Sequence, residues 1–344
     1  MHENARTAAV AQRLAEELLF PAAREIDASE VVPQRFLDAL ADAGLYGLVG
    51  PQWAGGLDAD APTAASVVEA LGGSSLTAAF VWIQHHSPVR AMAAAPWPLR
   101  DAWLTDLCSG RVRAGIAYAA LRRPGPPAAE ARPAPGDDGW ILDGFAPWVT
   151  GWGLIDVVLV GARAGADVVW LLIDAADSPT CSASLVDLAA LAASSTVTLR
   201  WTDHYVPASR VVGVEPYLDW VRRDSAGRQL NGYLSIGVAA RCCSLLGPTA
   251  LHQRVTAGRA ALDSASSATV ADARARASVL AVRAAAALVA SGGGRSIEAD
   301  QDAARLMREA TFLLVFAQTS DIRAAQLEAL GADGGRGGRG GAEG

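Results

Sequence analysis

The hydrophobic and polar positions of the chain change their period twice. From the start to about Gly110, apolar residues recur at helical spacing and stop at Gly or Pro breakers. Between about Arg113 and Val212 the pattern changes to short runs rich in Val, Ile, Trp and Thr, which predict strands. After about Tyr217 the helical period returns. This order of helices, strands and helices predicts a fold of the α+β class.

Three apolar runs in the central part predict strands, namely Ile155 to Val160, Val168 to Ile173 and Thr196 to Trp201. The segment from Leu121 to Gly139 carries five prolines and ends in Gly and Asp breakers. We interpret this segment as a loop beside the first strand, long enough to be functional or mobile.

The helical pattern after Tyr217 predicts three long segments. Gly247-Pro248 is expected to kink the first, because proline cannot continue the backbone hydrogen bonds of a helix. Ser291 to Arg295 separates the second segment from the third. The third is expected to run from about Ala299 to Leu330.

These patterns divide the chain into an N-terminal helical domain (1–111), a central β domain (112–213), a C-terminal helical domain (214–330) and a Gly/Arg tail (331–344). The tail has too little apolar surface to fold, so we expect it to be disordered. Its two Gly-Gly-Arg units resemble RNA-binding repeats, but an unfolded tail is the simpler interpretation.

The amino-acid composition excludes several classes of function. The 344 residues are 51% hydrophobic with a net charge of -7, which favours a large core and disfavours nucleic acid as a partner. Four cysteines, with Cys242 and Cys243 adjacent, match neither a disulfide framework nor a zinc site. The N-terminus lacks an apolar signal region, and the most apolar window, Ser278 to Ala290, is interrupted by Arg283. We therefore expect a cytoplasmic protein without a membrane span.

Several short motifs follow one another along the chain. The N-terminal part contains Gly44-Leu45-Tyr46-Gly47, then Pro51 and Trp53-Ala54-Gly55-Gly56-Leu57, then Ser109-Gly110. The central part contains Gly139-Trp140-Ile141-Leu142-Asp143-Gly144, then Trp148-Val149-Thr150 and Asp156. The C-terminal part contains Gly293-Gly294, Arg308-Glu309-Ala310, Val315-Phe316-Ala317-Gln318-Thr319 and Ile322.

Together and in this order, the motifs resemble the acyl-CoA dehydrogenase family of flavoproteins. The resemblance implies a helical N-terminal domain, a small central β-barrel or sandwich, and a C-terminal domain of the four-helix-bundle type. It also implies FAD as cofactor and an acyl thioester of CoA or a carrier protein as substrate. A flavoprotein or oxygen would accept the electrons, and the chain would be part of a homo- or hetero-oligomer.

The resemblance assigns roles to several residues. Tyr118 would form a wall of the flavin site, and Trp148 would pack on the flavin ring. Val149 and Thr150 would form hydrogen bonds to the edge of the ring. An aromatic wall with a few fixed donors suits a flat apolar ring system.

The more distant contacts to FAD fall on both sides of an expected subunit interface. An arginine, either Arg254 or Arg259, would reach the pyrophosphate of a partner's FAD. Gln318 and Thr319 would contact the adenosine side.

At the position of the family's catalytic residue, this sequence differs from the family. The glutamate that removes the α-proton of the thioester corresponds to Ala317, whose methyl group cannot accept a proton. A second position that carries the base in some members, before Arg228, is Gly227. Asp224 lies about one turn earlier and is a weak candidate, since an exposed carboxylate at a helix start is its simpler interpretation.

The loop after the first strand departs as well. Leu121 stands where the family has a hydroxyl for the flavin, and Arg122 and Arg123 follow it. These arginines either bind phosphate or keep the loop soluble. His85-His86 lacks the Cys or carboxylate spacing of a metal site, so packing or surface exposure is expected.

Three functions remain open from the sequence. The first is an FAD-dependent oxidoreductase acting on an acyl thioester, by CH-CH oxidation or by a divergent flavin reaction. The second is a non-catalytic partner subunit of a heteromeric acyl-CoA dehydrogenase. The third is a ligand-binding module without redox chemistry.

Overall fold

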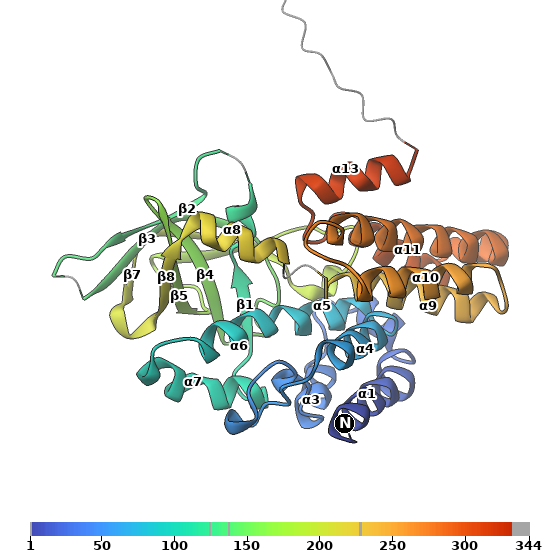
Figure 1. Ribbon diagram of the computed structural model, residues 1–344, viewed down its shortest axis with the longest axis horizontal. Coiled ribbons are helices and arrows are strands. Elements are labelled where there is room, and N and C mark those ends of the chain that lie inside the picture. The colour runs from blue at the N-terminus through green and yellow to red at the C-terminus, as the bar shows by residue number, and fades with distance from the viewer. Residues whose placement is uncertain (1, 124, 137, 227–228, 332–344) are drawn as a thin grey trace, which may run out of the picture.

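The computed structural model describes residues 2–123, 125–136, 138–226 and 229–331. In Figure 1 a sheet domain lies on the left, and most of the helices, from the two ends of the chain, pack together on the right. The N-terminal helices are α1 (His2–Leu14), α2 (Ala23–Ala28), α3 (Gln34–Asp42), α4 (Ala61–Gly72), α5 (Leu76–Gln84), α6 (His86–Ala93) and α7 (Trp97–Ser109). The α+β class with this arrangement confirms the fold predicted from the sequence.

Helix α5 lies at the centre of the molecule because its sequence is apolar on all sides. Every residue from Leu76 to Gln84 is buried, as expected of a helix without a polar face. Ser75 caps its N-terminus by accepting a hydrogen bond from the backbone N–H of Ala78. α5 is therefore surrounded by other parts of the protein on all sides.

The sheet domain contains strands β1 (Ala114–Ala117), β2 (Ala129–Pro133), β3 (Gly139–Val149), β4 (Val157–Ala164), β5 (Asp167–Asp174), β6 (Cys181–Leu185), β7 (Val197–Pro207) and β8 (Val211–Pro216). They form one sheet in the order β6-β7-β3-β2-β4-β5-β8, and β1 pairs in parallel with β4. Residues from β1 to β7 share one buried apolar cluster, so the sheet curls around its own core.

Strand β2 corrects the prediction of a continuous loop from Leu121 to Gly139. Ala129 and Ala131 are buried between exposed neighbours, which is the alternation of a strand. The strand pairs with β3 in antiparallel register. Prolines on either side of this short strand concealed it in the sequence.

The C-terminal helices are α8 (Tyr217–Ala226), α9 (Gly232–Leu246), α10 (Leu251–Asp263), α11 (Val270–Gly292), α12 (Asp302–Leu313) and α13 (Ser320–Ala329). α8 lies on the sheet against β5 and β8, and α11 packs against α9, α10, α12 and α13. Two predictions were wrong. Gly247-Pro248 ends α9 rather than kinking it, and the expected helix from Ala299 to Leu330 is two helices.

One stretch of the described chain, Val270–Ile297, is long and apolar enough to cross a membrane by length and composition alone. It consists of α11 and the turn that follows, and it exceeds the apolar window expected from the sequence. Because α11 contacts four other helices and carries Arg274 and Arg283, its apolar residues serve as the core of the bundle.

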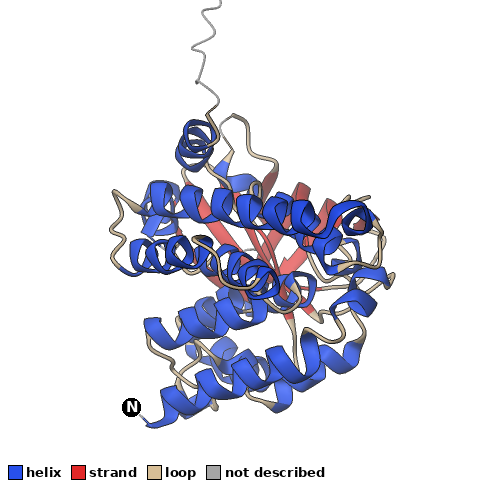
Figure 2. Ribbon diagram, turned by 90° about the vertical axis from the view of Figure 1, so that its right-hand side faces the viewer, coloured by secondary structure: helices blue, strands red, loops and turns tan. Residues whose placement is uncertain are grey.

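The two groups of helices share a single core, and Figure 2 shows them layered in front of the sheet. α4 and α9 cross so closely that a methyl group on Gly237 would lie 2.2 Å from the carbonyl oxygen of Glu69. A methyl group on Gly73 would lie 2.6 Å from the carbonyl oxygen of Gly237. Only glycine permits this approach of two backbones.

Candidate cofactor and substrate site

The end of β3 turns an aromatic side chain out of the sheet. The pairing of β3 with β7 shifts its register between Ala146 and Val149, which is typical of a β-bulge. Trp148 in this bulge has a φ of +65°, a strained value for a bulky residue. Its side chain is 48% exposed, whereas Val149 and Thr150 are buried. The bulge thus presents a flat apolar surface beside a fixed backbone.

The hydroxyl of Thr150 is positioned by hydrogen bonds to residues before and at the start of the next strand. Its Oγ1 lies 3.2 Å from Oγ1 of Thr196, which lies 2.8 Å from Oγ of Ser194. The backbone N–H of Gly151 also donates to the carbonyl of Ser194 at 2.9 Å. The position of this hydroxyl is therefore set by the segment that precedes β7.

The turn between α12 and α13 keeps its shape without a carboxylate. Ala317 has a φ of +47°, in the left-handed region. Arg274 of α11 is 6% exposed and donates to the carbonyls of Ala317 at 3.3 Å and Phe316 at 3.2 Å. These two bonds hold the turn whose central side chain is a methyl group.

Helix α5 brings the two turns to neighbouring sides of one element. Val81 approaches the first turn, since a methyl group built on Gly151 would lie 3.4 Å from it. The ring of Phe80 lies 5.2 Å from that of Phe316, next to Ala317. The structure thereby places the predicted ring-edge residues and the predicted base position around α5.

Asp224 is not the exposed helix-start residue that the sequence favoured. It lies near the C-terminal end of α8, and Arg122 donates to its two carboxylate oxygens at 2.9 and 2.6 Å. The side chains are 13% and 20% exposed, respectively. Burial pulls the pKa of Arg122 down, but the hydrogen bonds and charge of Asp224 leave it raised. This carboxylate fastens the loop of Arg122 to α8 rather than serving as an available base.

Tyr118 is also turned away from the expected role. Its ring is buried edge-to-face against Trp170 at 5.3 Å and Trp220 at 6.5 Å. Leu121 enters the same apolar cluster beneath α8. The two side chains therefore stabilise the loop after β1 and leave little surface exposed to a flat ring.

The structure distinguishes the two candidate arginines. Arg259 forms a bidentate ion pair with Glu69, at 2.5 and 2.8 Å. Arg254 is exposed on α10 and forms no ion pair with another described residue. Of the two, Arg254 is the one available to a phosphate group.

The remaining predicted contacts lie around the start of α13. The side-chain amide of Gln318 donates to the carbonyl of Leu314 at 2.9 Å and to Gln326 at 2.7 Å, so it faces its own helices. Thr319 precedes α13 and donates its hydroxyl to Asp321. Gly227, Arg228 and the tail from residue 332 lie outside the described residues.

The two adjacent histidines have structural roles. His85 accepts from the backbone N–H of Ala114 at 3.0 Å, and its other nitrogen lies 3.0 Å from the carbonyl of Leu107. His86 is buried against Trp82. Within the described residues, no cluster of His, Cys, Asp or Glu could hold a metal ion.

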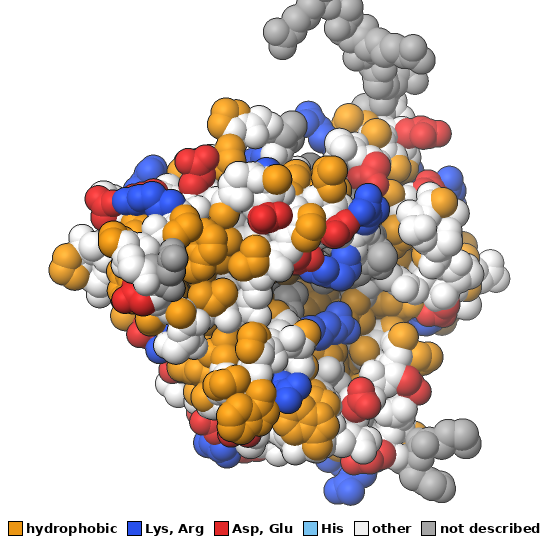
Figure 3. Space-filling view, turned by 60° about the vertical axis from the view of Figure 1, so that its left-hand side comes forward, with side chains coloured by type: hydrophobic (Ala, Val, Ile, Leu, Met, Phe, Trp, Pro, Cys, Tyr) orange, Lys and Arg blue, Asp and Glu red, His pale blue; other side chains and the backbone are white. Residues whose placement is uncertain are grey.

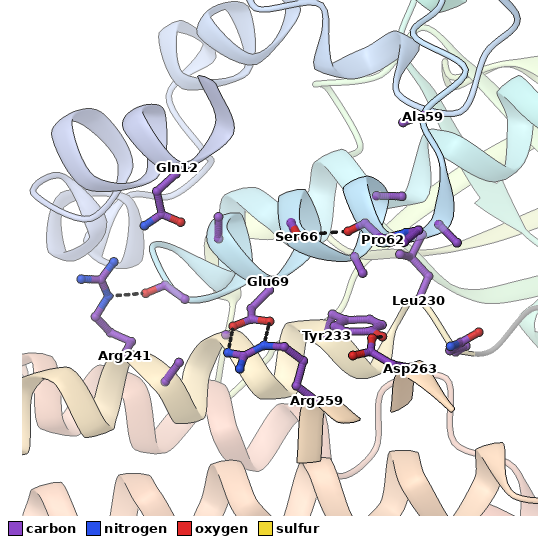
Figure 4. A pocket seen from close by; sticks show the side chains of 18 of the residues that line it. Gln12, Ala59, Pro62, Ser66, Glu69, Leu230, Tyr233, Arg241, Arg259 and Asp263 are labelled. Carbon is purple, nitrogen blue, oxygen red and sulfur yellow. Dashed lines mark hydrogen bonds and ion pairs between the residues drawn. The ribbon is translucent and has the colours of Figure 1, made fainter. Parts of the chain in front are cut away.

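A large cavity lies elsewhere, and no pattern in the sequence indicates it. It is a groove of about 860 Å³ with α4 and α9 as its floor and α1 and α10 as its sides. Figure 4 shows the Glu69–Arg259 pair and Tyr233 with Asp263 lining it. Small residues on α4 and α9 leave this space open, and no hydrophobic period marks such residues.

Hollows also occur near the sheet. A second cavity of about 20 Å³, large enough for one water molecule, lies between Leu121 and Phe145. Figure 3 shows a hollowed face of the molecule with apolar side chains inside and basic side chains at its rim. Trp148, Thr150 and Ala317 line neither of the two cavities.

Comparison with known proteins agrees with this architecture. Residues 2–111 match the family model described as acyl-CoA dehydrogenase, N-terminal domain. The whole chain superimposes on butyryl-CoA dehydrogenase from Megasphaera elsdenii with a TM-score of 0.82, covering 96% of this chain and 98% of that one. Residues 2–111 thus match the N-terminal domain of acyl-CoA dehydrogenases, and the chain has the acyl-CoA dehydrogenase fold.

The protein is distant in sequence from the solved structures that share its fold. It is 17% identical to the butyryl-CoA dehydrogenase. Glutaryl-CoA dehydrogenase in complex with glutaryl-CoA is 16% identical, with a TM-score of 0.81 and coverage of 96% of both chains. PigA in complex with FAD is 19% identical, with a TM-score of 0.81 and coverage of 97% of this chain and 99% of that one. A comparison with curated protein sequences finds no match.

Proposed function

We propose that this protein is a member of the acyl-CoA dehydrogenase family and an FAD-dependent oxidoreductase that acts on an acyl thioester. The observation that carries the proposal is the strained bulge at the end of β3. It exposes the ring of Trp148 while the hydroxyl of Thr150 is fixed behind it. Strain of this kind persists where a functional geometry requires it.

The residues at the ring edge fit FAD. The exposed face of Trp148 suits a flat ring, and Val149 and Thr150 supply backbone and hydroxyl groups beside it. Bound there, FAD supplies the acceptor for two electrons. Arg254 is available to phosphates across a subunit interface, and Thr319, at the start of α13, would contact the adenosine side. Gln318 and Tyr118 take no part, because both are engaged within the protein.

Removal of a proton from the substrate requires a group other than the two candidates in the described chain. Ala317 has no acceptor, and Asp224 is engaged by Arg122. The reaction is therefore either desaturation with a base from outside these positions or a divergent flavin reaction. The complex of glutaryl-CoA dehydrogenase with glutaryl-CoA supports an acyl thioester as the substrate class. We extend the proposal to a cytoplasmic oligomer whose electrons pass to a flavoprotein or oxygen.

The visible absorption spectrum of the purified protein, with release and identification of the flavin, tests the proposal. We expect about one FAD per chain, and a weaker affinity for FAD in Trp148→Ala because the ring loses its aromatic surface. Trp97→Ala, which removes another exposed tryptophan, is the matched control. A colourless protein that stays colourless after FAD is added would contradict the proposal.

A non-catalytic partner subunit is the second candidate. It is favoured by the simultaneous presence of Ala317 and of the buried Leu121, because both a proton acceptor and a flavin-binding hydroxyl are absent from their positions. Such a subunit would purify without flavin and would form a stable complex with a complete homologue. Size-exclusion chromatography of the two chains together distinguishes it from a flavin-loaded homo-oligomer.

A further inference from the structure

Charged side chains of both signs line the groove between α4 and α9, in equal number. They are Arg90, Arg241, Arg259, Glu16, Glu69 and Asp263. Four of the six form two bidentate ion pairs. Arg241 donates to the two carboxylate oxygens of Glu16 at 3.0 and 2.5 Å. Arg259 donates in the same way to Glu69. The remaining two, on α6 and α10, lie outside these pairs.

Arg90 brings a cation without a counter-charge to the groove. It lies on α6, is exposed, and forms no hydrogen bond or ion pair with another residue that the structure describes. Burial of part of its side chain lowers the pKa of Arg90, and the group that acts in the opposite direction is the phenol of Tyr118 rather than a carboxylate. A bound carboxylate would supply the missing counter-charge, because it accepts two hydrogen bonds from the planar guanidinium.

Asp263 brings an excess of negative charge to the groove. It is exposed at the end of α10, where Tyr233 donates to one of its carboxylate oxygens. Among the described residues, no cation forms an ion pair with it. Hydrogen bonds to Glu69 chiefly raise the pKa of Arg259, and the charge of Asp263 adds to this rise. Figure 4 shows the three side chains near one another. Two carboxylates and one guanidinium leave one net negative charge there.

The groove also has apolar walls. Pro62 and Ala65 of α4 and Leu230 before α9 contribute to them. The volume of about 860 Å³ is that of a site for a small organic molecule. A molecule of this size can contact the walls with a hydrocarbon part while its two ends reach charges of opposite sign. Trp148 and Thr150 do not line the groove, so its occupant need not contact a flavin.

We propose that this groove binds a small zwitterionic molecule, whose carboxylate pairs with Arg90 and whose ammonium group pairs with Asp263. Tyr233 occupies one oxygen of Asp263 and leaves the other for the ammonium group. A ligand with a single charge leaves either Arg90 or Asp263 without a counter-charge, and a neutral ligand leaves both. Electrostatic complementarity of this kind selects a ligand by its charges. The site is independent of the proposed function.

The test is isothermal titration calorimetry of the purified protein with ω-amino acids of increasing length, namely γ-aminobutyrate, ε-aminocaproate and ω-aminooctanoate. The acid and the amine of the same length, such as caproate and hexylamine, each carry one of the two charges. We expect one length to bind at least about tenfold more tightly than its acid and its amine, because it makes two charge-assisted contacts instead of one. If no length exceeds both, the proposal is overturned.

Two variants assign the two ends of the ligand. In Arg90→Gln the zwitterion should bind no better than its amine, and in Asp263→Asn no better than its acid. Asparagine still accepts the hydrogen bond of Tyr233, so the second change keeps that contact. Arg90→Lys keeps the charge and should retain most of the affinity. Unchanged affinity in both Arg90→Gln and Asp263→Asn overturns the site.

Arg100→Gln and Asp101→Asn are the matched controls, since they make the same changes on α7, outside the groove. Both should bind the zwitterion as the wild type does, and an equal loss in them would overturn the proposal. The flavin content of the same preparations separates the two proposals. Protein that binds the zwitterion but no FAD contradicts the proposed function alone, and protein that binds FAD but shows no preference for a zwitterion contradicts the groove site alone.

Discussion

Ala317 occupies a well-defined turn with a side chain that has no polar atom. Its backbone adopts a left-handed φ of +47°, and Arg274 donates to its own carbonyl and to that of Phe316. A non-glycine residue in this region is strained. The turn therefore has the geometry to present a side chain toward α5, and only the side chain itself is short.

The first prediction concerns a carboxylate introduced at position 317. In Ala317→Glu we expect FAD to be reduced by a medium-chain acyl-CoA about 10²–10⁴-fold faster than in the wild type, because a positioned base removes the α-proton. Stopped-flow absorbance at the flavin band measures the rate. Ala317→Gln has the same size without a proton acceptor and should give no gain. Equal rates in the glutamate and glutamine variants would show that the turn does not face the substrate.

Where the signal is local, the sequence predicts the structure well, as for the strand that ends next to Trp148 and Thr150. The contact of these two residues with a flavin stays a prediction. The sequence fails where the partner is remote. Arg122 and Asp224 are 102 positions apart, and no pattern near either residue indicates their ion pair. The contact of Tyr118 with Trp220 on α8 is likewise remote in sequence, and no local pattern indicates it.

At the scale of elements, the succession of helices and strands followed from hydrophobic periods, but breaks within apolar stretches did not. The expected helix after Ala299 continues in apolar period through Leu314 and Phe316, yet the chain turns there because Arg274 of another helix binds its carbonyls. Tertiary contacts of this kind override local preference. The α4–α9 crossing was likewise invisible, since isolated glycines in helices carry no period.

The crossing makes a prediction about one of its glycines. Gly237→Ala should lower the free energy of unfolding by about 1–3 kcal/mol or more, because the added methyl group meets the backbone carbonyl of Glu69. Gly258→Ala on α10 is the matched control, since its methyl group meets side-chain ends alone, those of Ile236 at 3.0 Å and Leu280 at 3.5 Å. Urea unfolding of both variants measures the difference. Similar losses in the two would mean that α4 and α9 can separate without cost.

At the scale of the whole molecule, the two helical groups and the sheet meet around buried polar residues as well as apolar ones. Arg305 and Glu309 are both fully buried, and Glu309 also accepts from the backbone N–H of Leu76 at 3.2 Å. His85 joins α5 to the start of β1 through Ala114. The charge state of such groups couples the stability of the whole fold to pH.

Burial lowers the pKa of His85 from 6.5 to about 4. An unfolded chain therefore binds a proton below pH 6.5 while the folded protein does not, so stability is full above 6.5 and falls as the pH drops toward 4. We expect the wild type to lose about 3 kcal/mol more between these pH values than His85→Gln, whose amide can replace both hydrogen bonds. Equal losses measured by urea unfolding would contradict the buried neutral state of His85.

The α4–α9 crossing has a consequence for folding during synthesis on the ribosome. Gly73 is synthesised long before Gly237, which must lie against it. Until α9 emerges from the exit tunnel, the nascent N-terminal half exposes the apolar face of α4 that α9 later covers. Domains usually fold in turn as they appear, but here the first domain has to wait for the last. We expect ribosome-bound chains that end before α9 to recruit chaperones, and chains that extend past α10 to release them.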